Sequence, residues 1–169
     1  LGHELSVRSW PGQGSVFSVT VPLATLPRVV RSRVSVPELP PQFEGAPVLC
    51  IDNEKNILAG MQSLLGRWQC RVAVARDRQE AQQVLDQGFV PELVLVDYHL
   101  DDGDTGTQVM LWLRERLGAD LPGVVISADG RQDVLSEISL AGLSYLPKPV
   151  KPAALRALIS RHVTLGSTG

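Results

Sequence analysis

Two kinds of hydrophobic spacing alternate along most of the chain, from residue 47 to about residue 163. Short apolar runs end at Asp, Ser or Pro, and between them apolar residues recur three and four positions apart. The runs predict strands that are buried on both faces, and the wider spacing predicts amphipathic helices. Strands that alternate with helices in this way indicate an α/β fold with one doubly wound, five-stranded parallel sheet.

Each predicted strand is followed by a predicted helix. The strands are expected at 48–51, 71–75, 93–97, 123–127 and 144–147. The apolar face of the first helix is expected to carry Ile57, Met61, Leu64 and Leu65. Asp77 is a candidate N-cap for the second helix, because its carboxylate can accept a hydrogen bond from the first turn. The segment 47–163 is therefore predicted to be one domain.

The N-terminal residues show a different pattern. Residues 4–9 and 15–21 alternate polar and apolar, and Pro11–Gly14 between them supplies turn-forming residues, which predicts an antiparallel hairpin. A lone hairpin is marginally stable in water, so we expect it to have belonged to a larger sheet. Residues 24–46 hold four prolines and three arginines without periodicity, which predicts a linker, and 164–169 are assigned to a tail.

Composition narrows the classes of function. The 16 Lys and Arg residues nearly balance 18 Asp and Glu residues, giving a net charge of −2, so no nucleic-acid partner is expected. No signal peptide is visible and no apolar run reaches the roughly 18 residues that span a bilayer, which favours a cytoplasmic location without membrane contact. Cys50 and Cys70 are expected to be buried free thiols rather than a disulfide.

Chemically reactive residues stand where the predicted strands end. They are Asp52, Asn53 and Glu54 after the first strand, Asp97 after the third, Ser127 after the fourth and Lys148 after the fifth. Because the carboxyl ends of parallel strands meet at one edge of the sheet, these side chains are expected to converge. A carboxylate can accept a phosphoryl group, neighbouring oxygens suit Mg²⁺, and a hydroxyl and an ammonium can neutralise phosphoryl charge.

With these residues in this order, the segment 47–163 resembles the receiver domain of two-component signalling. The resemblance implies a flavodoxin-like sheet of strand order 2-1-3-4-5 and a phosphorelay function in which Asp97 is the phosphoacceptor. It implies that Ser127 is the switch hydroxyl, Lys148 the lysine of the site and Tyr145 the switch aromatic. Lys148-Pro149 resembles the peptide bond that is cis in this family.

The same resemblance implies a Mg²⁺ site. Its ligands would be the carboxylates of Asp52 and Asp97 and the main-chain carbonyl of His99. The sequence departs from the family at Asn53, where the second acidic residue usually stands. An amide oxygen can coordinate Mg²⁺ but brings no charge, so weaker metal binding is expected unless Glu54 contributes.

Residues 1–23 resemble the last two strands of the ATP-binding domain of sensor histidine kinases, in which a Pro-Gly-x-Gly-Ser-x-Phe turn precedes the final strand. This chain has that turn at residues 11–17. The nucleotide-contacting motifs of that domain are absent, so the fragment itself is not expected to act as a kinase. The resemblance implies that the parent protein is a hybrid histidine kinase, of which this chain is a piece.

The expected function is therefore phosphorelay signalling, with a histidine kinase core or a histidine phosphotransfer protein as partner and a homodimer left open. Phosphorylation would bias the surface of the fourth helix, fifth strand and fifth helix. A degenerate receiver that binds partners without phosphorylation is an alternative that Asn53 suggests. A phosphatase of the haloacid dehalogenase type would need Asp at the position of His99. Flavodoxin-like cofactor binding is disfavoured because Asp52 and Glu54 would repel a phosphate.

Overall fold

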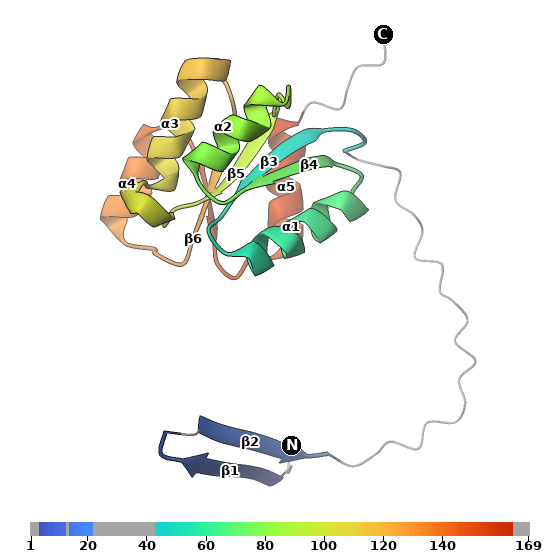
Figure 1. Ribbon diagram of the computed structural model, residues 1–169, viewed down its shortest axis with the longest axis vertical. Coiled ribbons are helices and arrows are strands. Elements are labelled where there is room, and N and C mark those ends of the chain that lie inside the picture. Colours follow the sequence, from blue (N-terminus) through green and yellow to red (C-terminus); the bar gives the residue numbers. More distant parts are fainter. Residues whose placement is uncertain (1–3, 13, 22–42, 164–169) are drawn as a thin grey trace, which may run out of the picture. The chain divides into compact units, whose positions relative to one another are not determined.

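The computed structural model describes residues 4–12, 14–21 and 43–163, which form two units. The first unit is a two-stranded hairpin and the second is an α/β domain (Figure 1). In the described part of the chain, no helix is long and apolar enough to cross a membrane. The residues assigned to the tail, and those of the linker before residue 43, lie outside the described residues.

The α/β unit is built on one parallel sheet of five strands. Its order is β4-β3-β5-β6-β7, which is the predicted order 2-1-3-4-5 counted from the first strand of this unit. The three central strands are buried along their whole length, as continuous apolar runs predict. The strands are β3 (Pro47–Ile51), β4 (Arg71–Ala75), β5 (Leu93–Asp97), β6 (Gly123–Ser127) and β7 (Ser144–Pro147).

Helices cover both faces of this sheet. α1 and α5 lie on one face, and α2, α3 and α4 lie on the other (Figure 1). Successive residues of a strand point to opposite faces, so each buried strand feeds both hydrophobic layers. The helices are α1 (Lys55–Arg67), α2 (Arg78–Asp86), α3 (Gly106–Leu117), α4 (Gln132–Leu140) and α5 (Pro152–His162), with a short 3-10 helix η1 (Asp101–Gly103) before α3.

Local capping explains where two of these helices begin. The Asp77 carboxylate accepts a hydrogen bond from the backbone N–H of Glu80 at 2.7 Å, which confirms Asp77 as the N-cap of α2. α3 begins with a capping box, in which Thr105 and Gln108 each accept from the other's backbone N–H. This box sets the start of the helix that follows the Asp97 loop.

The apolar face of α1 differs from the prediction at one position. Ile57 was predicted to be buried but is 38% exposed, and Leu58 is buried in its place. Leu58, Met61 and Leu65 are three and four residues apart, so they form one stripe toward the sheet. A shift of one residue turns a side chain by about 100° around the helix, which places Ile57 at the edge of this stripe.

Residues 43–46, which the sequence placed in the linker, pack against the α/β unit. Phe43 is 3% exposed and its ring lies 6.2 Å from that of Trp68. The backbone N–H of Arg71 donates to the carbonyl of Ala46 at 2.9 Å, extending the β3–β4 edge. A proline-rich segment gives no periodic signal, so its last residues could not be told apart from the rest of the linker.

The hairpin consists of β1 (Glu4–Trp10) and β2 (Gly14–Thr20) in antiparallel register. Leu5 pairs with Val19 and Val7 pairs with Phe17, so these four side chains share one face. All four are more than half exposed in this unit. An apolar face without a partner is what the last two strands of a larger sheet present when taken by themselves.

Candidate functional site

Three charged residues meet at the carboxyl edge of the α/β sheet. The Lys148 ammonium lies 3.1 Å from Oδ1 of Asp97 and 3.3 Å from Oδ2 of Asp52. Both aspartates are buried, each with 6% of its surface exposed. Asp97 ends the central strand β5, Asp52 follows the adjacent strand β3, and Lys148 follows β7. The structure therefore brings together the acid, the neighbouring acid and the amine that the strand ends predicted.

The strand connections hold Lys148 in place. Its backbone N–H donates to the carbonyl of Ser127 at 2.9 Å, which continues the pairing of β6 with β7 by one residue. The Lys148-Pro149 peptide bond is cis, as the family resemblance implied. The lysine thus leaves the sheet edge beside the two carboxylates.

Burial and pairing act in opposite directions on these groups. Burial raises the pKa of Asp97, and the hydrogen bond from Lys148 opposes this rise only in part. Burial lowers the pKa of Lys148, but its contacts with Asp97 and Asp52 outweigh burial and raise the pKa above its ordinary value. The lysine therefore stays a cation, while Asp97 is a carboxylate held in a poorly solvated place.

Ser127 and Tyr145 lie on the strands beyond Asp97. Ser127 is fully buried at the end of β6, and its hydroxyl accepts a hydrogen bond from the backbone N–H of Asp129 at 3.0 Å. The Tyr145 hydroxyl donates to the main-chain carbonyl of Ser127 at 3.3 Å, so the ring is turned toward β6. The two predicted switch residues are thus in direct contact with each other.

Comparison with known proteins identifies the family and supports the fold. Residues 48–160, most of the chain, match the response regulator receiver domain family. The chain belongs to the receiver family. The Vibrio cholerae chemotaxis protein CheY4 has the same fold, with a TM-score of 0.64 and 21% identity over 70% of this chain and 99% of that one. A response regulator/GGDEF domain protein aligns with a TM-score of 0.63 and 25% identity over 72% of this chain and 49% of that one.

Two longer relatives are sensor kinases. The autoinducer 2 sensor kinase/phosphatase LuxQ of Vibrio parahaemolyticus is 28% identical over 160 residues. LuxQ of Vibrio harveyi is 25% identical over 159 residues. Each alignment includes 92% of this chain but only 18% of the relative, so the chain spans less than a fifth of their length.

The receiver domain offers oxygen ligands for a small hard cation. Among the described residues there is no group of three or more acidic, histidine or cysteine side chains that could hold a metal ion. Two carboxylates, Asp52 and Asp97, do share the sheet edge through Lys148. Because Mg²⁺ keeps several waters and commonly takes only one or two protein carboxylates, this donor set fits Mg²⁺.

The two doubtful metal ligands lie in different surroundings. The side-chain amide of Asn53 donates to Oδ1 of Asp101 at 2.8 Å, which joins the loop after β3 to the loop after β5. Glu54 flanks the start of α1 with an exposed side chain, and its backbone N–H donates to Oδ1 of Asp52 at 2.9 Å. The Glu54 backbone therefore orients Asp52. Asn53 is instead held by Asp101, which was not among the site residues predicted from the strand ends.

His99 lies two residues after Asp97. Its side chain is 65% exposed, with Nε2 3.9 Å from an oxygen of Asp129, and its ring meets that of Tyr98 edge-on. The backbone of His99 forms an isolated antiparallel bridge with Thr105. This bridge closes the loop after β5 and fixes the main-chain segment that carries the predicted carbonyl ligand.

Two neighbours of Asp97 were not found from the sequence. Tyr98 is buried, and its hydroxyl donates to Glu137 of α4 at 2.8 Å, which together with burial raises the pKa of Tyr98 to about 12. At Gly106, a Cβ atom would lie 2.3 Å from the main-chain oxygen of Asp97. Only glycine allows α3 to begin this close to the end of β5. Neither contact has a signal in residue spacing.

A cavity of about 600 Å³ opens beside Asp97 and Lys148. Its walls are mainly apolar and come from α1 and from the segment after β7, including Ile57, Met61 and Val150. The partial exposure of Ile57 follows from its place in this wall. The edge of the sheet that carries Asp97 and Lys148 thus borders an apolar surface.

Proposed function

We propose that this chain is the receiver of a hybrid sensor histidine kinase and that Asp97 accepts a phosphoryl group from a phosphohistidine. The observation that carries the proposal is the Lys148 ammonium shared between Asp52 and Asp97 at 3.3 and 3.1 Å. An amine in this place can neutralise charge that develops on a phosphoryl group during transfer. Ser127 supplies a buried hydroxyl on the adjacent strand.

The transfer replaces one bond with another. An oxygen of Asp97 forms a bond to phosphorus while the phosphorus–nitrogen bond of the phosphohistidine breaks. The electron pair of that bond returns to the imidazole nitrogen, which takes up a proton from water. Mg²⁺, held by Asp52, Asp97 and the carbonyl of His99, would add positive charge beside the phosphoryl oxygens. The partner is a histidine kinase core or a histidine phosphotransfer protein, and the location is cytoplasmic.

Two observations support a hybrid kinase as the parent protein. The LuxQ alignments cover 92% of this chain, so they extend beyond the receiver domain. The hairpin has the turn sequence of the last strands of a kinase ATP-binding domain, and its apolar face has no partner within its own unit. We therefore assign residues 1–23 to the end of such a domain and 47–163 to the receiver, with a linker between them whose last residues, 43–46, pack on the receiver.

The decisive experiment is phosphorylation in the presence of Mg²⁺ and acetyl phosphate, followed by intact mass measurement. The wild-type chain should gain one acid-stable, base-labile phosphoryl group, and Asp97→Asn should gain none. Asp120→Asn is the matched control, because Asp120 is exposed and follows α3, before β6 begins. A wild-type chain that gains no phosphoryl group would instead favour a degenerate receiver that only binds partners.

A further inference from the structure

Asn53 is held by a carboxylate from another loop. It stands where receivers usually carry a second acidic residue, and its Nδ2 donates to Oδ1 of Asp101 at 2.8 Å. Asn53 comes directly after Asp52, and Asp101 begins η1 in the loop that follows Asp97. One side-chain hydrogen bond therefore connects the loop that carries Asp52 to the loop that follows Asp97.

The chemistry of the two groups fixes the orientation of the amide. A carboxylate accepts hydrogen bonds only, so Asn53 must present its NH₂ group to Asp101. The amide is planar, and its oxygen is therefore turned away from Asp101. Asn53 then offers a neutral oxygen ligand whose direction is already set, and Asp101 brings a negative charge within one hydrogen bond of it.

An aspartate at position 53 could not form this contact. Two carboxylates at this separation repel each other, and one of them would move or take up a proton. Asn53 and Asp101 are thus compatible as a pair, with the charge of the missing acid carried by the other loop. This pairing accounts for a departure from the family pattern that the sequence leaves unexplained.

We propose that Asp101 is a positioning residue of the phosphorylation site, which orients Asn53 and returns the missing negative charge to the cation-binding edge. The proposal rests on the function proposed above, since it concerns Mg²⁺ at that site. Outer partners that orient a metal ligand typically change metal affinity by about 10- to 100-fold. Because Asp101 is exposed, we expect an effect of about tenfold, at the lower end of that range.

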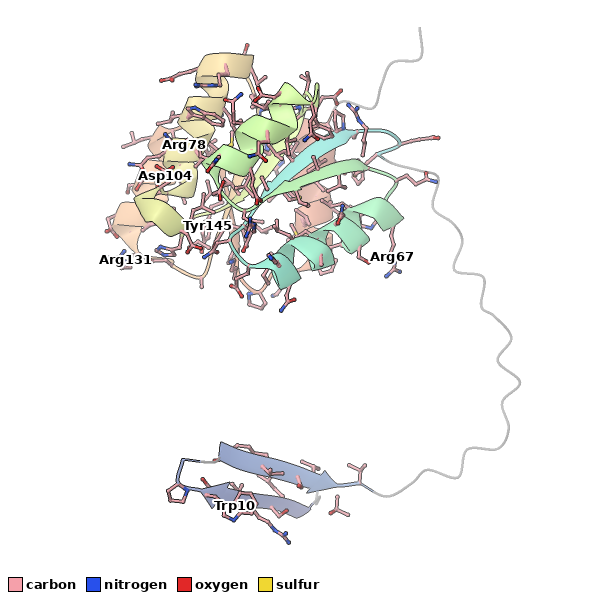
Figure 2. The ribbon with its side chains drawn as sticks, viewed as in Figure 1. Trp10, Arg67, Arg78, Asp104, Arg131 and Tyr145 are labelled. Atoms are coloured by element: carbon pink, nitrogen blue, oxygen red, sulfur yellow. The ribbon has the colours of Figure 1, made fainter. Side chains whose placement is uncertain are left out.

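Mg²⁺ titration of the purified chain, followed by amide NMR shifts without any phosphoryl donor, tests this role. Asp101→Ala should weaken Mg²⁺ binding about tenfold. Asp101→Asn should recover part of the loss, because its side-chain oxygen can still accept from Asn53. Asp104→Ala is the control within the same loop, since Asp104 instead accepts from Arg78 at 2.9 Å (Figure 2), and it should change binding less than about twofold.

A variant that changes both Asn53 and Asp101 distinguishes the orientation of Asn53 by Asp101 from a general effect of the negative charge of Asp101. In an Asn53→Asp background there is no amide for Asp101 to hold and position 53 supplies its own charge, so Asp101→Ala should weaken binding much less than it does in the wild type. An equal loss in both backgrounds would show that Asp101 acts only as a distant charge and would overturn the proposal. So would a folded Asp101→Ala variant that binds Mg²⁺ like the wild type. A wild-type chain that binds no Mg²⁺ would contradict the proposed function as well as the role of Asp101. A wild-type chain that binds Mg²⁺ no better than a folded Asp101→Ala variant would contradict the role of Asp101 alone.

Discussion

Asp97, the central residue of the site, is subject to two opposing effects, burial and pairing with Lys148. Asp97 is 6% exposed, and burial raises its pKa even though Lys148 donates a hydrogen bond to it. A carboxyl group whose pKa is raised by folding opposes folding once the pH exceeds its unfolded value. The burial of this acid therefore lowers the stability of the fold, as is common at functional sites.

Replacing this charge should stabilise the domain. Asp97→Asn keeps the shape of the side chain and removes the buried charge, so we expect a gain of about 0.5–1 kcal/mol in unfolding free energy at pH 7. The gain should shrink toward pH 4, where the wild-type acid takes up a proton in both folded and unfolded chains. Urea unfolding across this pH range measures it, with Asp120→Asn as the control. A loss of stability at pH 7 would contradict this prediction.

The residues of the site that stand at strand ends could be predicted from the sequence. Asp52, Asp97 and Lys148 could be placed from sequence because parallel strands bring their carboxyl ends to one edge. The contacts Tyr98–Glu137 and Asn53–Asp101 could not, since they join residues 39 and 48 positions apart through loop and helix geometry. No local pattern records which side chain meets another across such distances.

At the scale of elements, the junction of β5 with α3 leaves no room for a side chain at Gly106. A Cβ at Gly106 would lie 2.3 Å from the main-chain oxygen of Asp97, which cannot move without displacing the strand. Gly106→Ala is therefore expected to destabilise the domain by about 2 kcal/mol or more and to lower phosphorylation of Asp97.

A second glycine provides the comparison. Gly60 lies within α1, and a Cβ there would meet nothing within 4 Å. Gly60→Ala should stabilise the domain by about 0.5–1 kcal/mol, because alanine restricts the unfolded chain and favours helix. Thermal unfolding of the two variants should give shifts of opposite sign. Equal shifts would mean that α3 can move away from Asp97.

Most of the strands and helices of the α/β unit could be predicted from the sequence. All five strands of the sheet were predicted within a residue of their observed ends, because apolar runs between polar turns leave little freedom. The apolar face of α1 was less certain, since Ile57 and Leu58 are adjacent and only packing decides which one is buried. Ile57 lies in the cavity wall, so its exposure depends on the tertiary structure.

At the scale of the whole molecule, the α/β unit extends a few residues before its first strand. Phe43 is 3% exposed and packs in the layer formed by α1 and α5. A segment of residues 43–163 should therefore unfold at the same temperature as the full chain. A segment of residues 47–163 loses this ring and should be less stable by about 3 kcal/mol.

Phe43→Ala in the full chain should reproduce most of that loss, which separates the effect of the ring from that of chain length. Calorimetry of the two segments and the variant provides the measurement. If residues 47–163 melt together with the full chain, Phe43 is dispensable and the domain begins at β3. The proline-rich sequence before residue 47 could not reveal this, because a single buried ring creates no periodicity.

The sharing of one ammonium by two carboxylates has an electrostatic consequence. With a single positive group between two acids, these three side chains together keep one net negative charge, to which Asp101 adds a further one. On the proposed function, free phosphate and other small anions are repelled from the acceptor oxygen of Asp97, and a divalent cation has to bind first to make the local charge positive. If that cation is scarce, phosphoryl transfer to Asp97 should therefore fail even when the donor histidine is phosphorylated.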